Sequence, residues 1–580
     1  MRGVPKKYVR FFSYFAILAV PAVFILVWYQ EHHSALTKGF PLQPGESKQT
    51  TEFVGDNKEA VNILRARSPE EKFIIGIGMY TCLHLTKYLE FCPRHVGGHT
   101  LPTKALRTVI QKDINHSKGF RIVGLSNYLT YDSITTAQLA ELLSDNDIPS
   151  AAVTVAASNA EHLVPDSPEL PLGYTIITGK SLTESEFVTE ISVLFGEDCV
   201  DPRPTWHLSK NWRLKHSKVP CYLTFRTRSS GPHEKESHKL SASFENPFKI
   251  VQLADLHYSV GEGRCRDEFP EHDNCIADPK TLAFVEKVLD TEKPQLVVFT
   301  GDQIMGSECV QDSATALLKV VDPVIKRRIP YAMVWGNHDD EGNLDRWEIS
   351  KLAESLPFSL FKIGDRDTND NSFGVGNYVH YIYGKDGNPL SALYFLDAHK
   401  YSPNAKAYPG YDWIKEEQWN HFSSYKDTFV DQKASLSMAF FHIPLPEYLN
   451  VDSNTSPGTQ NPLIGNFKEG VTAPKYNSKG IATLRELGVK VTSVGHDHCN
   501  DYCLLEDSQS PATDERIWLC FGGAAGEGGY GGYGGTERRI RIYQLDFLKK
   551  NIETWKVLNS SPEKPFDHQT LVSAGVPLLP

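Results

Sequence analysis

Short apolar segments between residues 248 and 495 each lead into polar residues that can bind metal ions. Helical patterns near residues 279–290 and 314–326 separate the first three segments, which are 250–253, 296–299 and 331–335. This alternation predicts a largely parallel sheet covered by helices on both faces. Because the carboxyl ends of parallel strands meet at one edge, the polar residues should form one site. They are Asp255-Leu256-His257, Gly301-Asp302-Gln303, Gly336-Asn337-His338-Asp339, His442 and His496-Asp497-His498.

The order D-x-H, G-D, G-N-H-D, H and G-H-x-H resembles the calcineurin-like metallophosphoesterases, a superfamily of phosphatases with two metal ions. The resemblance extends from about Phe248 to Tyr543. It implies an α/β fold, a four-layer α/β/β/α sandwich. We expect this domain to follow a mixed α+β accessory domain and one N-terminal transmembrane helix.

The resemblance also implies the ligand set and the chemistry. Carboxylate and imidazole ligands suit Mn, Fe or Zn, and two such ions activate a water that attacks phosphorus. Asn337 would also orient the phosphate, and His338 would protonate the leaving alcohol, so no Ser or Cys nucleophile is needed. The implied metal ligands are Asp255, His257 and His498 for the first ion, Asn337, His442 and His496 for the second, and Asp302 as the bridge.

Two departures from related families occur at Met305. Ser/Thr phosphatases have an Asp there that orients the catalytic His, so Asp339 or Asp340 would have to substitute. Purple acid phosphatases have a metal-binding Tyr there, so we do not expect a purple Fe(III) site.

The stretches Gly301–Gly306 and Gly522–Gly526 resemble a fungal branch that includes a membrane-linked phosphatase regulating the cell cycle. That resemblance implies phosphoserine or phosphothreonine proteins as substrates, with roles in cell-cycle start and unfolded-protein signalling. A phosphodiesterase or broad acid phosphatase of the same fold is the alternative, and a lumenal binding or regulatory protein is another. The net charge of −11 disfavours nucleic acid as a partner.

Basic residues at the amino terminus precede an uncharged run from Phe11 to Tyr29, long enough to cross a bilayer. We favour an uncleaved anchor over a signal peptide, with the basic flank in the cytoplasm. The body would then lie in the lumen of the endoplasmic reticulum or secretory pathway, although regulatory substrates would be cytosolic. Sequons at Asn115, Asn454 and Asn559 agree with a lumenal body.

Composition shifts divide the chain further. In the accessory segment we expect strands at 73–79, 120–124, 174–178 and 221–225 and helices at 135–143 and 184–195, with no catalytic constellation. The expected parts are a basic tip and anchor at 1–33, a stalk at 34–58, the accessory domain at 59–228, a linker at 229–243, the catalytic domain at 244–560 and a tail at 561–580.

Several features surround the expected site. The loop 261–279 would form its rim, the glycine-rich run 522–535 would be a flap or a plain loop, and His399 would lie behind the ligands or face substrate. Arg538 and Arg539 would contact phosphate or solvent. Cys82/Cys92 and Cys265/Cys275 form local disulfides or stay free, and Cys499 and Cys503 serve packing or a disulfide.

Overall fold

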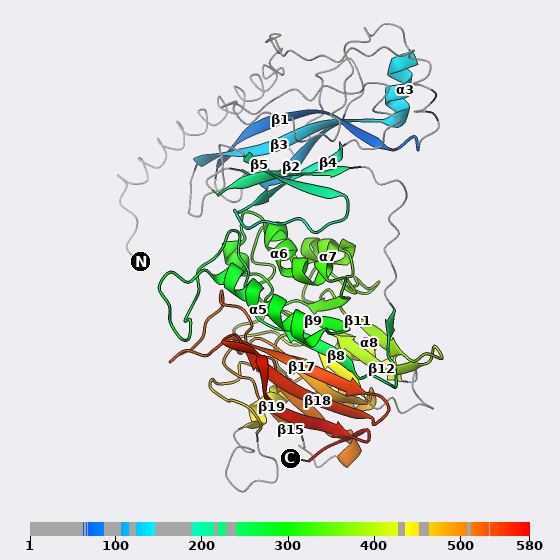
Figure 1. Ribbon diagram of the computed structural model, residues 1–580, viewed down its shortest axis with the longest axis vertical. Helices are drawn as coiled ribbons and strands as arrows, with labels where there is room; N and C mark the ends of the chain where they lie inside the picture. The colour runs from blue at the N-terminus through cyan, green and yellow to red at the C-terminus, as the bar shows by residue number, and fades with distance from the viewer. Residues whose placement is uncertain are drawn as a thin grey trace, which may run out of the picture.

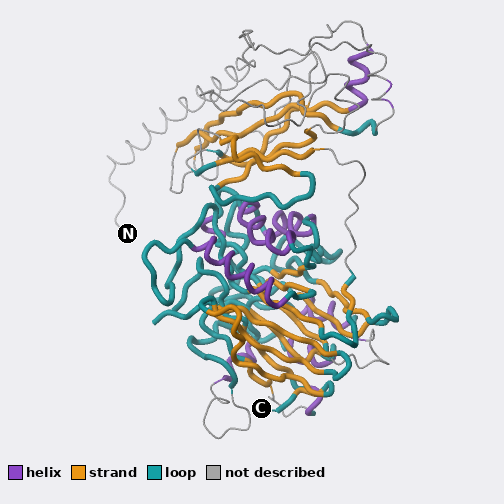
Figure 2. Tube along the Cα trace, viewed as in Figure 1, coloured by secondary structure: helices purple, strands orange, loops and turns teal. Residues whose placement is uncertain are grey.

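The protein consists of an upper part built from strands and a larger lower part in which helices cover two sheets (Figures 1 and 2). The computed structural model describes residues 62, 65, 68–85, 106–114, 123–144, 188–213, 219–227, 239–426, 436–451, 463–506, 512–532 and 534–579. The predicted anchor at 1–33 and stalk at 34–58 lie outside these residues. Within them, no helix has both the length and the apolar character needed to span a membrane.

The first sheet of the lower part contains the three strands predicted from the apolar segments. Neighbouring strands are parallel from β10 to β8 and antiparallel from β8 onward. In spatial order the strands are β10 (Tyr331–Val334), β9 (Leu296–Thr300), β8 (Phe248–Leu253), β17 (Arg539–Asp546), β18 (Asn551–Leu558), β19 (Ser561–Ser573) and β20 (Val576–Pro577).

The second sheet carries the two later ligand segments on β13 and β14. Its central strands β12, β13, β14 and β16 are parallel. In spatial order the strands are β15 (Cys503–Glu506), β16 (Ile517–Phe521), β14 (Val489–Val494), β13 (Ser437–Phe440), β12 (Pro389–Phe395), β11 (Tyr378–Tyr383) and β7 (Leu240–Ser241).

Helices cover the outer face of each sheet. The helices are α5 (Ala277–Glu292), α6 (Ser313–Lys326), α7 (Arg346–Ser355), α8 (Glu416–Ser423) and α10 (Gly480–Glu486), with short 3-10 turns at Gly306–Glu308, Pro446–Asn450 and Thr513–Glu515. One hydrophobic core contains residues of the first sheet, of the inner face of the second sheet and of helices α5, α6 and α7. Another core contains residues of the second sheet and of helices α8 and α10. The mixed α/β architecture is therefore as predicted. The expected largely parallel sheet with helices on both faces is replaced by two sheets packed on each other, and most strand pairs of the first sheet are antiparallel.

Buried polar side chains join the two sheets across the apolar core. Gln252 of β8 donates to the Val494 carbonyl, and the Ser493 hydroxyl of β14 lies 2.7 Å from both Gln252 Oε1 and the Tyr543 hydroxyl of β17. A buried polar group is costly when unpaired, so these bonds favour one alignment of the sheets. This alignment places the ends of β8, β9, β13 and β14 together.

From residue 68 to residue 227, the described residues of the upper part form two antiparallel three-stranded sheets and one helix. The strands pair in the orders β1 (Lys72–Leu85), β3 (Val123–Thr135), β2 (Leu106–Asp113) and β4 (Val188–Phe195), β6 (Cys221–Thr227), β5 (Trp206–Arg213), and the helix is α3 (Thr136–Ser144). The strands predicted at 73–79 and 221–225 and the helix at 135–143 are confirmed. Residues 120–122 and the strand predicted at 174–178 lie outside the described residues.

The helix predicted at 184–195 is wrong, because residues 188–195 form strand β4. The segment contains β-branched residues, which favour strands. Ile191 and Val193 enter a core shared with β1 and β6, while Ser192 between them is only partly buried. Tertiary pairing with β6 thus decides the conformation.

The tail predicted from residue 561 is also wrong, because β19 is a long strand paired with β18. Leu571 and Val572 are completely buried. At the other boundary, Leu240 and Ser241 of the predicted linker pair with β11.

A chain ending at residue 560 should therefore be less stable than the native chain. Removing the two buried aliphatic side chains alone should lower the free energy of unfolding by about 3 to 6 kcal/mol. Urea denaturation measures this change. A chain ending at Leu578 is the control, since it keeps β19 and β20 and loses only the last two residues; equal stability of both truncations would contradict the role of β19.

Candidate metal centre

The predicted ligands lie at the carboxyl ends of strands from both sheets. β8 leads to Asp255 and His257, and β9 leads to Asp302. β10, β13 and β14 lead to the others, so five strands supply one buried site. The seven predicted ligand residues, all buried, are Asp255, His257, Asp302, Asn337, His442, His496 and His498.

Several ligands have left-handed backbone conformations. The φ angles of Asp255, His257, Asp302 and His496 are 53°, 52°, 51° and 76°. Such a conformation costs about 1 to 2 kcal/mol for a residue other than glycine. Hydrogen bonds hold the turns, because Asp255 N donates to Gly301 O and His257 N to Asp302 O. Strain of this kind is typical of functional sites.

The ligand atoms form two groups that share one carboxylate. Asp255, His257, Asp302 and His498 offer atoms that all lie within 4.8 Å of one another, as do Asp302, His442 and His496. Asp302 Oδ2 is 3.8 Å from His257 Nε2 and 3.3 Å from His442 Nε2, so one oxygen faces both groups. Asn337 Oδ1 lies 3.3 Å from His442 Nε2 and thus joins the second group.

The histidine hydrogen bonds show that this donor set fits cations. His498 Nδ1 donates to Tyr530 O and His442 Nδ1 donates to Thr300 O, each at 2.9 Å. When these two rings are neutral, each Nε2 has a lone pair. His498 Nε2 lies 3.0 Å from His257 Nε2, and His442 Nε2 lies 3.2 Å from His496 Nδ1. The other nitrogens of two rings, His257 Nδ1 and His496 Nε2, are buried and have no hydrogen-bond partner among the described residues. The close approach of His257 Nε2 to His498 and of His496 Nδ1 to His442 suits bound metal ions.

The electrostatics of the cluster agree with this. Burial opposes ionisation of Asp302, but His442 and His257 beside it hold the pKa of its carboxyl well below the usual range. Burial would lower the pKa of His442, yet the Asp302 carboxylate raises it to about 9, so a cation bound here would displace the proton of His442 Nε2. Burial and neighbouring imidazoles lower the pKa of His257 and His496. These two rings are therefore neutral, as metal ligands must be.

His338 lies beside the ligands and is held by a carboxylate that the sequence analysis missed. His338 N donates to Asp302 Oδ1 at 2.8 Å, and its Nδ1 lies 2.7 Å from Glu341 Oε2. Burial would lower the pKa of His338, but Asp302 and Glu341 raise it. Glu341 also closes a turn by donating its N–H to the His338 carbonyl. The i, i+3 spacing of the two residues was the available signal.

Neither predicted substitute for the missing Asp orients His338. Asp339 is buried and accepts the backbone N–H groups of Asp302, Ile304 and Gly336, so it joins the loops after β9 and β10. Asp340 pairs with Lys400 at 2.6 Å. Met305 is buried and borders the pocket beside His257.

Tyrosine rings also surround the ligands. Tyr530, from the glycine-rich run, stacks on His498 with ring centroids 3.9 Å apart. Tyr411 meets His496 edge-on at 4.3 Å, and Tyr401 stacks on Tyr411. These rings fix the orientation of two ligand imidazoles. The sequence placed Tyr530 in a loop near the site but gave no signal for the other two.

The remaining predicted neighbours have structural roles. Arg538 is buried and contacts Glu527 and the carbonyls of Gly529 and Tyr530, while Arg539 pairs with Asp501. Both side chains are only 2% exposed, so the predicted solvent contact is wrong. His399 lies behind the site, where its Nε2 contacts Gln418.

Two cysteine pairs form disulfides in the described residues. Cys265–Cys275 closes the rim loop, as one predicted alternative has it, and Cys503 bonds to Cys520 rather than to Cys499. Cys499 is free and buried. Cys92 lies outside the described residues, so the pair with Cys82 stays a prediction.

Comparison with known proteins identifies the family. The calcineurin-like phosphoesterase model matches residues 248–500. "Phosphatase DCR2" of Saccharomyces cerevisiae is 47% identical, with 100% of each chain covered. The chain belongs to the calcineurin-like phosphoesterases. It is therefore a metallophosphoesterase, as the sequence resemblance implies.

More distant relatives share parts of the chain. "Probable inactive purple acid phosphatase 29" of Arabidopsis thaliana is 33% identical, covering 59% of this chain and 90% of its own. The crystal structure of a dimetal phosphatase from Danio rerio is 14% identical with a TM-score of 0.38, covering 57% of this chain and 99% of its own.

Replacing Glu341 should affect the step in which the leaving group is protonated. In Glu341→Gln, kcat for an alkyl phosphate should fall about tenfold, because His338 loses the carboxylate that orients and charges it. The loss should be smaller for p-nitrophenyl phosphate, whose leaving group needs little protonation. Steady-state kinetics on both substrates test this, with Glu262→Gln on the exposed rim as the control. Equal losses on the two substrates would point to a general structural defect instead.

Proposed function

We propose that the protein is a phosphomonoesterase that uses two metal ions and acts on phosphoserine and phosphothreonine proteins. The observation that carries the proposal is the position of Asp302 Oδ2 between the two ligand groups, with His338 held beside it. The full-length likeness to a relative named as a phosphatase supports it. Some plant relatives are named as inactive, but all the implied ligands and His338 are present in this chain, and six of the ligands lie in the two clusters.

Each residue has a defined task in this proposal. Asp255, His257 and His498 would hold one cation, Asn337, His442 and His496 the other, and Asp302 both. When bound, Mn, Fe or Zn ions would supply Lewis acidity toward the phosphoryl oxygens and an activated water.

The chain itself would supply orientation and a proton. The Asn337 amide would position the phosphoryl group. His338 Nδ1 faces Glu341, which leaves Nε2 to protonate the leaving alcohol. The fungal resemblance extends the proposal to control of cell-cycle start and of unfolded-protein signalling.

The full-length chain should hydrolyse p-nitrophenyl phosphate and a phosphoserine peptide, and His338→Ala should lose about 10²-fold or more of this activity. Metal analysis of both samples should give equal contents, because His338 is not in the implied ligand set. Preferential turnover of bis(p-nitrophenyl) phosphate would replace the monoesterase by a phosphodiesterase. Bound metal without any turnover would favour a binding or regulatory role.

We also propose that residues 1–33 anchor the protein in the endoplasmic reticulum or secretory pathway with the catalytic domain in the lumen. The one-sided basic flank of the apolar run supports this orientation. In intact microsomes the carboxyl-terminal body should resist added protease and become sensitive once detergent is present. Digestion without detergent would reverse the orientation and place the enzyme beside cytosolic substrates.

A further inference from the structure

A pocket of about 410 Å³ lies directly beside the ligand His257. Its volume is in the range of pockets that hold small ligands or side chains. Most of its wall comes from residues 259–278, which include most of the rim predicted at 261–279 and are called the rim loop below. The rest of the wall includes Met305 and Glu308. A phosphoryl group at the metal centre would therefore have the pocket next to it.

The side chain of Lys319, from α6, holds the rim loop. Its Nζ donates to the Gly261 carbonyl at 2.8 Å and pairs with Asp278 at 2.5 Å. The same Asp278 oxygen accepts the backbone N–H of Ser259 at 3.0 Å. Ser259 is two residues from His257, so the Lys319 contacts fix the chain that leaves the ligand. Lys319 is only 5% exposed, and a charge so deeply buried must be fully paired.

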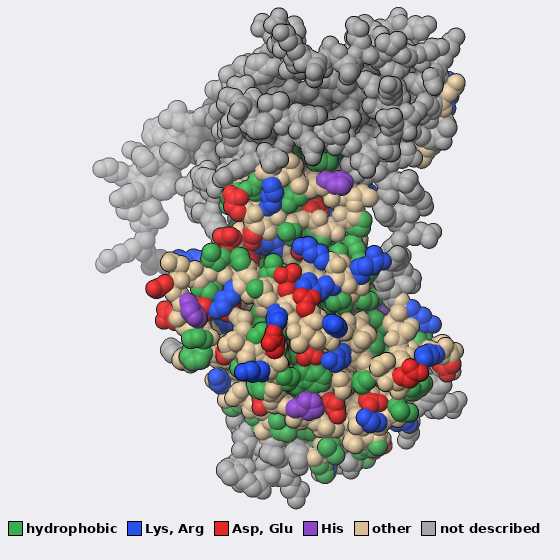
Figure 3. All heavy atoms as spheres, viewed as in Figure 1, with side chains coloured by type: hydrophobic (Ala, Val, Ile, Leu, Met, Phe, Trp, Pro, Cys, Tyr) green, Lys and Arg blue, Asp and Glu red, His purple; other side chains and the backbone are tan. Residues whose placement is uncertain are grey.

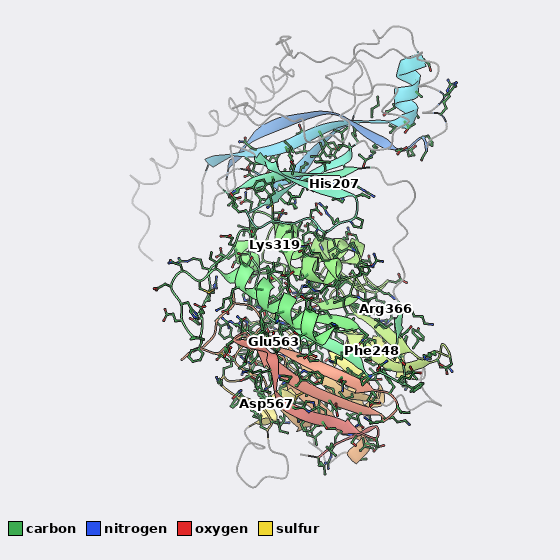
Figure 4. All side chains as sticks on the ribbon, viewed as in Figure 1. His207, Phe248, Lys319, Arg366, Glu563 and Asp567 are labelled. Atoms are coloured by element: carbon green, nitrogen blue, oxygen red, sulfur yellow. A yellow bond between two sulfur atoms is a disulfide. The ribbon has the colours of Figure 1, made fainter. Side chains whose placement is uncertain are left out.

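The third partner of Lys319 belongs to the accessory domain. Asp198, in the turn after β4, lies 2.5 Å from Lys319 Nζ. Figure 4 shows Lys319 on α6 where the helices meet the sheet that contains β4. The ion cluster thus joins the accessory domain to the rim loop through one lysine.

The backbone of the accessory domain also contacts the rim loop. A Cβ added to Gly196, whose φ is 96°, would be 2.8 Å from Gly261 Cα. The backbone segments around Gly196 and Gly261 are therefore so close that only glycine fits at position 196. Val260 packs against the core of the accessory domain and lines the pocket. Phe195 N donates to Thr315 of α6 at 3.1 Å. The part of the pocket wall formed by the rim loop therefore lies between the metal centre and the accessory domain.

The charged residues of the pocket wall are Arg264, Arg266, Asp278 and Glu308, of which Asp278 is already paired with Lys319. Arg264 and Arg266 are exposed. Arg266 is 3.8 Å from Glu308, and both side chains are more than one-third exposed, so this pair is weak and replaceable. An acidic group of a ligand could take the place of Glu308. On the face shown in Figure 3, basic and acidic side chains are interspersed.

We propose that this pocket binds acidic residues next to the phosphorylated residue of a polypeptide substrate, and that the accessory domain sets its shape through Asp198 and Lys319. The proposal rests on the proposed phosphatase function and adds a substrate class to it. It makes Asp198 and Lys319 positioning residues, since both act through the rim loop. The accessory domain is then part of substrate recognition.

The decisive variant is Asp198→Asn in the full-length chain. It removes the negative charge that the accessory domain places beside Lys319 and keeps the Lys319–Asp278 pair. The ratio of kcat/KM for an acidic phosphoserine peptide to that for p-nitrophenyl phosphate should fall about fivefold, chiefly through KM. Lys112→Gln is the matched control. Lys112 also joins the two domains, but its partners, Val193 O and Asp312, lie outside the rim loop. In Lys112→Gln the ratio of the two kcat/KM values should stay at that of the native chain.

Equal falls in both variants would overturn the proposal, because domain docking in general would then be the cause. Equal kcat/KM of the native chain for the acidic peptide and a matched neutral peptide would overturn the acidic substrate class. Peptide binding, measured by fluorescence anisotropy, should weaken in Asp198→Asn as well, and an unchanged affinity would count against the proposal.

Binding also separates this inference from the phosphatase proposal. A native chain that binds the acidic peptide without hydrolysing it would reject the phosphatase and keep the pocket. If Asp198→Asn does not fold, Val260→Ala loosens the same contact without changing a charge and should lower the same ratio.

Discussion

The rest of the site depends on the contacts of the Asp302 carboxylate. One of its oxygens faces a histidine of each ligand group, and the other accepts the backbone N–H of His338. A carboxylate buried among imidazoles is stable only when positive charge or a metal ion compensates it. The low pKa of Asp302 and the raised pKa of His442 express this mutual dependence. The positions of the predicted ligands, the position of His338 and the local charge therefore all depend on the Asp302 carboxylate.

Such a cluster requires a rigid frame, because its seven predicted ligands come from the ends of five strands. Gln252, Ser493 and Tyr543 align the two sheets through buried hydrogen bonds. Asp339 then joins the loops after β9 and β10, and Tyr530 fixes the ring and the tautomer of His498. These contacts offset the strain of the left-handed ligand residues, which would otherwise relax and move the side chains apart.

The sequence predicts the lower part well because its signals are local. Each apolar run is a strand, and the residue that follows it carries the ligand, so the ligand set could be named without coordinates. The predictions that were wrong concern residues whose structure is decided by tertiary partners. β4 has helix-like spacing but pairs with β6, β19 has few apolar residues and still completes a sheet, and Arg538 and Arg539 are buried by contacts distant in sequence. Glu341 was missed since the family pattern directed attention to position 305.

The contact between the two parts of the chain follows from the same reasoning about buried charge. Lys319 cannot be buried with Asp278 alone at low cost, because it has further donors and the Gly261 carbonyl satisfies only one of them. Asp198 supplies the remaining acceptor, and it comes from the accessory domain. A catalytic domain that lacked this partner would have to reorganise the rim loop beside His257. The accessory domain is thus tied to the metal centre by the requirement that a buried lysine be fully paired.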